Sequence, residues 1–215
     1  MTPSYSLLKN HKGWWYARFR IKWPEDSNPL WHIDLLLARE VIAPILSQST
    51  KVIPLWRFHR RAAHDEEGHQ FSFIFYSSKK TAQKIYTSIG SNPWLKKMTR
   101  AKIVQYLPEN TERIIRPNLG DTSDPHWPPM VMKTWPYFIM GVCRMWLNLI
   151  GEIMQNDPVT QRASSLNKLL SCYEKINKTL NAIWKEHGGH AFLHHLNAIF
   201  GYESVLVHEW NLKKF

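Results

Sequence analysis

The feature that most constrains the fold of this chain is a two-residue alternation on either side of a polar turn, between residues 53 and 77. In residues 55–61, two sets of side chains occupy alternate positions, and residues 71–76 show the same alternation with aromatic and β-branched side chains. Such alternation is typical of two half-buried antiparallel strands. The acidic run 65–67 and Gly68, which can adopt a positive φ, predict the turn between them. The first set is Leu55, Arg57, His59 and Arg61 against Trp56, Phe58 and Arg60; the second is Phe71, Phe73 and Phe75 against Ser72, Ile74 and Tyr76.

Helix and strand patterns flank this hairpin on both sides. Residues 14–23 alternate as a strand, and residues 30–47 carry apolar side chains at helical spacing, with Pro44 expected to kink or end the helix. After the hairpin, a helix is predicted over 79–89 and a strand over 101–107. The order strand, helix, strand, strand, helix, strand predicts an α+β fold over residues 1–107, a ferredoxin-like antiparallel sheet with both helices on one face.

The second half of the chain has a different character. Residues 108–133 are rich in proline and predict a connecting loop, whereas residues 134–215 predict an all-helical layer packed on the sheet. Thr134 is the expected N-cap of its first helix, with Pro136 in the first turn. That helix is apolar, but Arg144 near its centre disfavours a membrane span and favours a core helix. Further helices are expected over 158–187, ending at Gly188 and Gly189, and over 190–200 and 203–211.

Composition indicates an acidic partner. The formal net charge is +11 with a pI near 9.7, and 11 tryptophans are present. Such a protein attracts nucleic acid, an anionic membrane or an acidic peptide. The two cysteines, Cys143 and Cys172, lie in apolar helical stretches and predict buried reduced thiols; with no secretory signal apparent, we expect a cytoplasmic protein.

Basic side chains on the predicted strands form the first candidate site. We expect cations from the first strand and the hairpin to converge on one surface, roofed by helices from the latter part of the chain. Arginine and aromatic side chains on a sheet bind RNA by stacking and phosphate contact, or carboxylates of a peptide. The residues predicted to bind the substrate are Arg18, Arg20, Arg57 and Arg61, with Lys22 and Arg60 as neighbours.

Histidines form the second candidate. His190 and His194 are spaced to lie on one helical face, with His187 and His195 close by, but the acidic residue of a zinc-protease motif is missing. Phosphate loops, nucleophile elbows and kinase motifs are absent as well. The sequence therefore predicts neither a metal site nor a cofactor.

Several short segments resemble the C-terminal domain of lantibiotic dehydratases, which also occurs as stand-alone proteins of thiopeptide biosynthesis. The matching pieces are residues 41–46 (VIAPIL), 56–60 (WRFHR), Asp65, Gly68-His69 and 195–201 (HLNAIFG). The resemblance implies elimination of glutamate from a modified peptide, or ring formation, on a ribosomally made substrate. It also implies that Arg60, His69 and His195 take part in catalysis.

Three functions therefore stay open. The first is a peptide-modifying or peptide-binding protein of a natural-product pathway. The second is a nucleic-acid-binding module that uses the same basic face. The third is a non-catalytic subunit whose tryptophan-rich surface docks a larger protein; a homodimer is compatible with each.

Overall fold

A four-stranded antiparallel sheet forms the centre of the fold. The computed structural model describes residues 12–156 and 165–204. The strands are β1 (Lys12–Ile21), β2 (Leu55–Ala62), β3 (His69–Ser78) and β4 (Val104–Pro108), in the order β2-β3-β1-β4. The protein is thus α+β, and the predicted hairpin is confirmed, since Leu55 lies opposite Tyr76 and Ala62 opposite His69.

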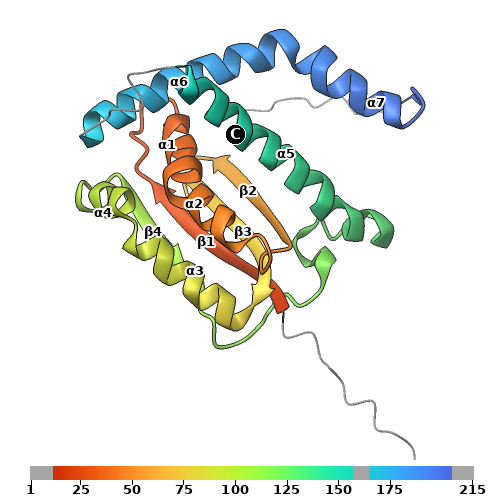
Figure 1. Cartoon of the computed structure of the whole chain (residues 1–215), viewed down its shortest axis with the longest axis horizontal. Helices are drawn as coiled ribbons and strands as arrows, with labels where there is room; N and C mark the ends of the chain where they lie inside the picture. The colour runs from red at the N-terminus through yellow and green to blue at the C-terminus, as the bar shows by residue number, and fades with distance from the viewer. Residues whose placement is uncertain (1–11, 157–164, 205–215) are drawn as a thin grey trace, which may run out of the picture. The chain divides into compact units, whose positions relative to one another are not determined.

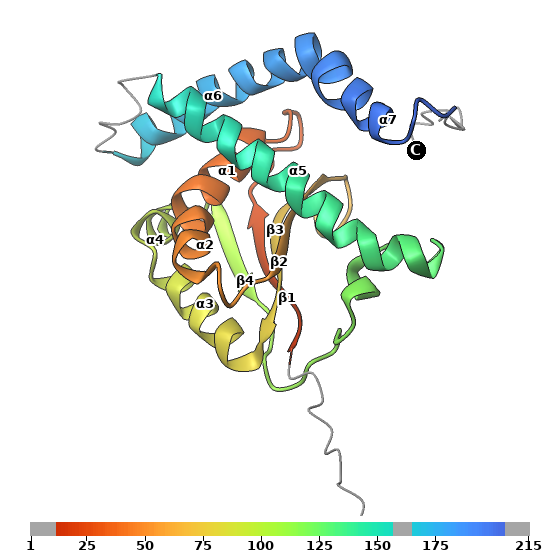
Figure 2. The same cartoon turned by 45° about the vertical axis from the view of Figure 1, so that its right-hand side comes forward.

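Helices cover one face of this sheet, as Figures 1 and 2 show for α1, α2 and α3. They are α1 (Trp31–Leu36), a π-helical segment (Leu37–Ile42), α2 (Ala43–Ser49), α3 (Lys79–Ser91) and α4 (Pro93–Arg100). Pro44 was expected to kink or end the first helix, but helical structure continues through it to Ser49. The π-helical turn ends immediately before Ala43, so Pro44 falls in the first turn of α2, where its missing N–H costs little.

The core lies between these helices and the covered face. β3 contributes alternate residues, and Phe71, Phe73 and Phe75 are each completely buried. Their rings meet Phe19 of β1 and Phe58 of β2 at centroid distances of 5.9 and 5.2 Å from Phe71. Two-residue periodicity therefore sends one set of side chains into an aromatic core and the other set to the second face.

The helix after the connecting loop begins earlier than predicted. A short 3-10 turn (η2, Leu119–Thr122) is followed by α5 (Pro129–Gln155), so the expected start at Thr134 is wrong. Pro129 takes the first helical position, which suits proline, and the Thr134 hydroxyl donates to the carbonyl of Met130, inside the helix. Pro136 accordingly lies within α5.

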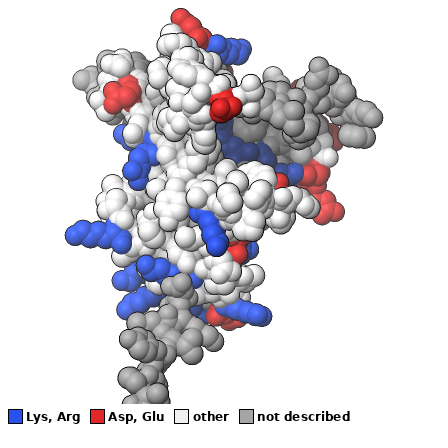
Figure 3. Space-filling model, turned by 90° about the vertical axis from the view of Figure 1, so that its right-hand side faces the viewer, with Lys and Arg blue, Asp and Glu red and all other residues white. Residues whose placement is uncertain are grey.

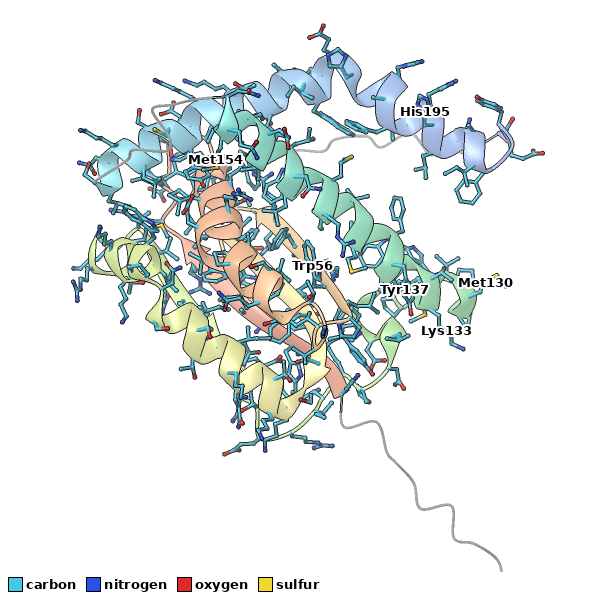
Figure 4. All side chains as sticks on the ribbon, viewed as in Figure 1. Trp56, Met130, Lys133, Tyr137, Met154 and His195 are labelled. Carbon is cyan, nitrogen blue, oxygen red and sulfur yellow. The ribbon has the colours of Figure 1, made fainter. Side chains whose placement is uncertain are left out.

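α5 runs beside β2 and is only partly a core helix. Cys143, Leu147 and Ile150 are buried, whereas its N-terminal half exposes apolar side chains, including Tyr137, which Figure 4 labels together with Met130 and Lys133. In length and composition α5 is also apolar enough to cross a membrane, a test that core helices of soluble proteins pass too, and 22% of its most apolar window is buried. The exposed set is Met130, Val131, Tyr137, Phe138 and Val142.

The chain divides into two compact units, Met1–Asn177 and Lys178–Phe215. The boundary falls within α6 (Leu166–His187), whose Tyr173 hydroxyl donates to Glu40 Oε1 at 2.6 Å inside the first unit. The second unit continues through a π-helical segment (Gly188–His194) to α7 (His195–Ile199). Gly188 and Gly189 were expected to end the helix, but helical structure runs through them and Trp184 stacks on Phe192. Most of the predicted helix 203–211 and the start of the helix at 158 lie outside the described residues.

Candidate functional site

Strand register separates the predicted basic residues onto two faces. Arg60 lies opposite Phe71, which belongs to the helix-covered face. Arg18 lies opposite Ser72, which itself pairs with His59 of β2, so these residues share the second face. The expectation that Arg60 and Arg18 converge on one surface is therefore wrong, because neighbouring residues of a strand point to opposite sides. Arg20, Arg57 and Arg61 lie on the second face with Arg18.

On the covered face, Arg60 and His69 meet at a buried carboxylate. Asp34 of α1 accepts a hydrogen bond from Arg60 Nε at its Oδ2, at 2.7 Å. Its other oxygen, Oδ1, lies 3.0 Å from His69 Nε2. Since a carboxylate only accepts, Nε2 is the protonated nitrogen of this ring. Asp34 thus ties α1 to β2 and β3 at once.

Two tryptophans enclose the Arg60 guanidinium. Its Cζ lies 4.9 Å from the ring centroid of Trp31 and 5.1 Å from that of Trp146, and its Nη2 donates to the Trp31 carbonyl. Trp31 also meets the His69 ring edge-on at 4.8 Å. Cation–π contacts and an ion pair therefore hold Arg60 in one orientation.

Burial decides what this cluster offers to a ligand. Asp34 and His69 have no exposed side-chain surface, while 29% of the Arg60 side chain is exposed. His69 Nδ1 is buried and has no hydrogen-bond partner among the described residues. Both Asp34 oxygens are occupied, so the cluster acts first as a cross-link, and only Arg60 reaches solvent. The catalytic roles of Arg60 and His69 stay predictions.

Asp34 is the member of this cluster that sequence reasoning missed. The signal was present, because Asp34 is a carboxylate between Ile33 and Leu35 on the buried side of an apolar helix. Charged residues are almost never fully buried unless they are paired. A search for a buried partner would have pointed to the arginines of the hairpin.

His32, next to this cluster, provides a pH test. Burial lowers its pKa below the ordinary value of 6.5, although Glu174 and Asp34 oppose the shift. The unfolded chain then binds more protons than the folded one in the window just below pH 6.5, so stability is present above that window and falls as the pH drops through it. We expect an NMR titration midpoint below 6.5 for His32 and a flatter stability profile in that window for His32→Gln. A midpoint at or above 6.5 would contradict this assignment.

The second face is covered over only part of its area. Trp14, Leu55, Ile74 and Tyr76 form a buried cluster under Leu119 and Met140. Trp14 Nε1 donates to the carbonyls of Asn118 and Leu119, which fastens the connecting loop to this end of the sheet.

The rest of the second face is polar and cationic, and we call it the basic half-face. Arg20 is exposed, while Arg18 is half-buried with its guanidinium 4.7 Å from the Tyr16 ring. None of the residues in the four described strands is acidic. The basic half-face consists of Arg18, Arg20, His59, Arg61, Gln70, Ser72, Gln105 and Leu107, as the strand register places them.

Arg57 and Arg61 are engaged within the protein. Arg57 is 8% exposed, donates to the Thr122 carbonyl at 3.1 Å and lies over the Trp135 ring at 5.0 Å. Burial lowers the pKa of Arg57, yet an arginine keeps its charge at neutral pH. Arg61 pairs with Asp65 and Glu67 of the turn. Arg57 thus holds the connecting loop to the sheet, and Arg18 and Arg20 are the more available cations.

A pocket of about 560 Å³ opens at the end of the sheet that is nearest to Arg20. Trp23 and His64 stack at 4.3 Å and join the chain after β1 to the β2–β3 turn. Cations and carboxylates both line the pocket, so its charge is mixed. The cations are Arg20, Lys22 and Lys102, and the carboxylates are those of Glu25, Asp65, Glu66 and Glu67.

His195 belongs to the second unit, on α7 as Figure 4 shows. It is exposed, its Nδ1 lies 2.9 Å from the His190 carbonyl, and the rings of His190, His194 and His195 are 5.1 to 5.4 Å apart. Within the described ranges 12–156 and 165–204, no group of three or more potential ligands has a geometry that could hold a metal ion. The predicted catalytic role of His195 stays a prediction.

Comparison of the chain with protein-family models, with curated proteins and with solved structures found no match.

Proposed function

We propose that the protein binds an acidic peptide along the basic half-face. The observation that carries this proposal is the pairing of two available cations, Arg18 and Arg20, with a sheet that contains no carboxylate. Polar side chains of Gln70, Ser72 and Gln105 lie in the same rows. Gln105 is exposed and would supply a hydrogen bond beside the charge contacts, whereas Gln70 and Ser72 are buried and Gln70 Nε2 donates to Ser72 Oγ. Carboxylates of Asp and Glu are the natural complement of guanidinium groups.

We also propose that the sheet is ferredoxin-like. The order β-α-β-β-α-β, the strand order β4-β1-β3-β2 and helices over one face support this class. In such a fold the face opposite the helices is available for binding, and here part of that face is the basic half-face.

Peptide is favoured over nucleic acid by the position of the aromatic rings. Trp14 and Tyr76 lie on the second face but are 1% and 7% exposed, under the connecting loop. Tyr16 lies between the guanidinium groups of Arg18 and Arg116. Binding of single-stranded nucleic acid uses rings on which bases stack, and the described part of this face offers only the exposed imidazole of His59 and no open Trp, Tyr or Phe ring.

The substrate class comes from the resemblance to lantibiotic dehydratase C-terminal domains, so we propose a ribosomally made precursor peptide. Modification of that peptide would require Arg60 or His69 to reach it. Because Asp34 engages both, peptide binding is the better supported activity. The alternative of docking a larger protein is favoured by the exposed apolar side chains of α5, such as Tyr137 and Phe138.

Fluorescence anisotropy with a labelled peptide rich in Asp and Glu tests the proposal. We expect salt-sensitive binding to the wild type, and affinity roughly tenfold lower in Arg18→Gln/Arg20→Gln, because each lost charge contact costs about 0.5–1 kcal/mol. Lys51→Gln, at an exposed cation of the α2–β2 turn, is the control and should bind as the wild type does. Equal binding by the double variant, or equal binding of a neutral peptide, would contradict the proposed function.

A further inference from the structure

The two edges of the sheet differ in what covers them. At the β2 edge, the backbone N–H of Phe58 donates to Cys143 Sγ of α5 at 3.2 Å, so α5 occupies that edge. β4 forms the opposite edge, and no strand lies beyond it in the part of the chain that the structure describes. An uncovered edge presents unpaired backbone groups to a further strand.

The register of β4 identifies those groups. Lys22 N donates to Ile103 O and Glu109 N donates to Tyr16 O, and the β1–β4 pairs between them continue the same register. Hydrogen-bonded pairs alternate along an antiparallel ladder, so Gln105 and Leu107 bond inward to β1. The N–H groups of Val104 and Tyr106 therefore point outward, and Pro108 ends the edge without an N–H to offer.

The segment of chain that forms this edge and the helices next to it carries charge of one sign, although Glu25, Asp65, Glu66 and Glu67 line the pocket at the Val104 end of β4. From Gly68 to Pro108 the chain contains seven Lys and Arg residues and no Asp or Glu. Lys96, Lys97 and Arg100 of α4 and Lys102 beside β4 are exposed. Figure 3 shows another side of the molecule, where Lys and Arg side chains are scattered together with Asp and Glu side chains and with uncharged surface between them. A second copy would bring the same cations to the edge and be repelled, whereas an acidic strand would be attracted.

A cavity of about 500 Å³ lies directly beside the edge. Gln105 and Tyr106 of β4 line it together with Lys96 and Arg100 of α4. Gly90 contributes a wall without a side chain. Side chains of an added strand that point toward the helices would enter this cavity and meet the two cations.

We propose that an extended acidic peptide adds to the sheet as a fifth strand along β4, with acidic side chains directed at Lys96 and Arg100. This mode of binding rests on the proposed function, because it assigns the peptide's backbone to the edge next to the basic half-face. Main-chain hydrogen bonds to Val104 and Tyr106 supply affinity, and the cavity selects acidic side chains at alternate positions. A nucleic acid has no such backbone donors and acceptors in strand geometry.

The test uses a labelled peptide of alternating Glu and Val and the same peptide N-methylated at alternate residues, which keeps the charge but cannot pair. We expect Lys96→Glu/Arg100→Glu to weaken binding of the first peptide by more than about tenfold, and N-methylation to do the same. Lys80→Glu/Lys84→Glu is the matched control, because it makes the same charge change at the same spacing on α3, outside the cavity. We further expect slower hydrogen exchange of the Val104 and Tyr106 amides when the peptide is bound.

The outcomes separate the two proposals. Acidic peptide that binds equally well after N-methylation, or equally well to Lys96→Glu/Arg100→Glu, overturns strand addition while the basic half-face keeps its proposed function. Absence of binding by any acidic peptide overturns both. If an oligothymidine of equal charge binds more tightly than the acidic peptide, and this binding is lost in Lys96→Glu/Arg100→Glu, the edge binds nucleic acid instead and the inference is overturned.

Discussion

Replacing Asp34 by Asn is expected to lower the free energy of unfolding by about 3 kcal/mol. The change keeps the shape of the side chain but removes the charge that Arg60 and His69 contact. Arg60 would then keep a cation against Trp31 and Trp146 without its counter-charge. Because 29% of the Arg60 side chain is exposed, water offsets part of the loss, which places the effect at the lower end for broken buried pairs.

Urea unfolding followed by tryptophan fluorescence measures this change, with a lower midpoint and an unchanged slope expected. Asp65→Asn is the matched control, since it breaks an Arg–Asp pair at the exposed turn and should leave the midpoint almost unchanged. If the two variants unfold at the same urea concentration, Asp34 is not the cross-link that the geometry indicates.

Replacing Phe71 by Ala is expected to cost about 3–5 kcal/mol. Phe71 is completely buried at the centre of the sheet, between Phe19 and Phe58. Its removal leaves a cavity that rings on three strands border, and a sheet cannot collapse to fill it without changing register. The same urea experiment measures the loss.

Two variants check that volume is the cause. Phe71→Leu keeps most of the volume and should cost less than about 1.5 kcal/mol. Phe138→Ala removes the same ring from a site on α5 that is 47% exposed and should have little effect. Equal losses in Phe71→Ala and Phe71→Leu would show that ring contacts, rather than the cavity, dominate this core.

Local patterns predicted the strands well and the helix boundaries less well. The hairpin was predictable because alternation and a Gly-containing turn act over a few residues, and Gly68 indeed has a φ of +61°. The start of α5 was not predictable from the sequence, because Pro129 and Thr134 are both acceptable in a first helical turn. Which one begins the helix depends on how the preceding loop is fastened, here through Trp14 to the carbonyls of Asn118 and Leu119.

The candidate sites show the same division. Arg57 and Arg60 point to opposite faces of the sheet. This follows from strand alternation and could be predicted from the sequence. The sequence did not reveal that Thr122 and Trp135 hold Arg57 while Arg20 stays available, because those contacts join residues far apart in the sequence. The buried Asp34 cluster likewise needed three separate elements to be brought together.

By itself, the sequence determined the alternating strands, the apolar faces of the helices and the strong positive charge, since these depend on residue type and short spacing. The tertiary structure alone decided which cations are paired, which face is covered and which edge of the sheet is open. Those outcomes depend on long-range packing, in which α5 covers the β2 edge and no strand lies beyond β4 in the described chain. Pairing and exposure, rather than composition, therefore determine which cations the proposed acidic peptide could contact.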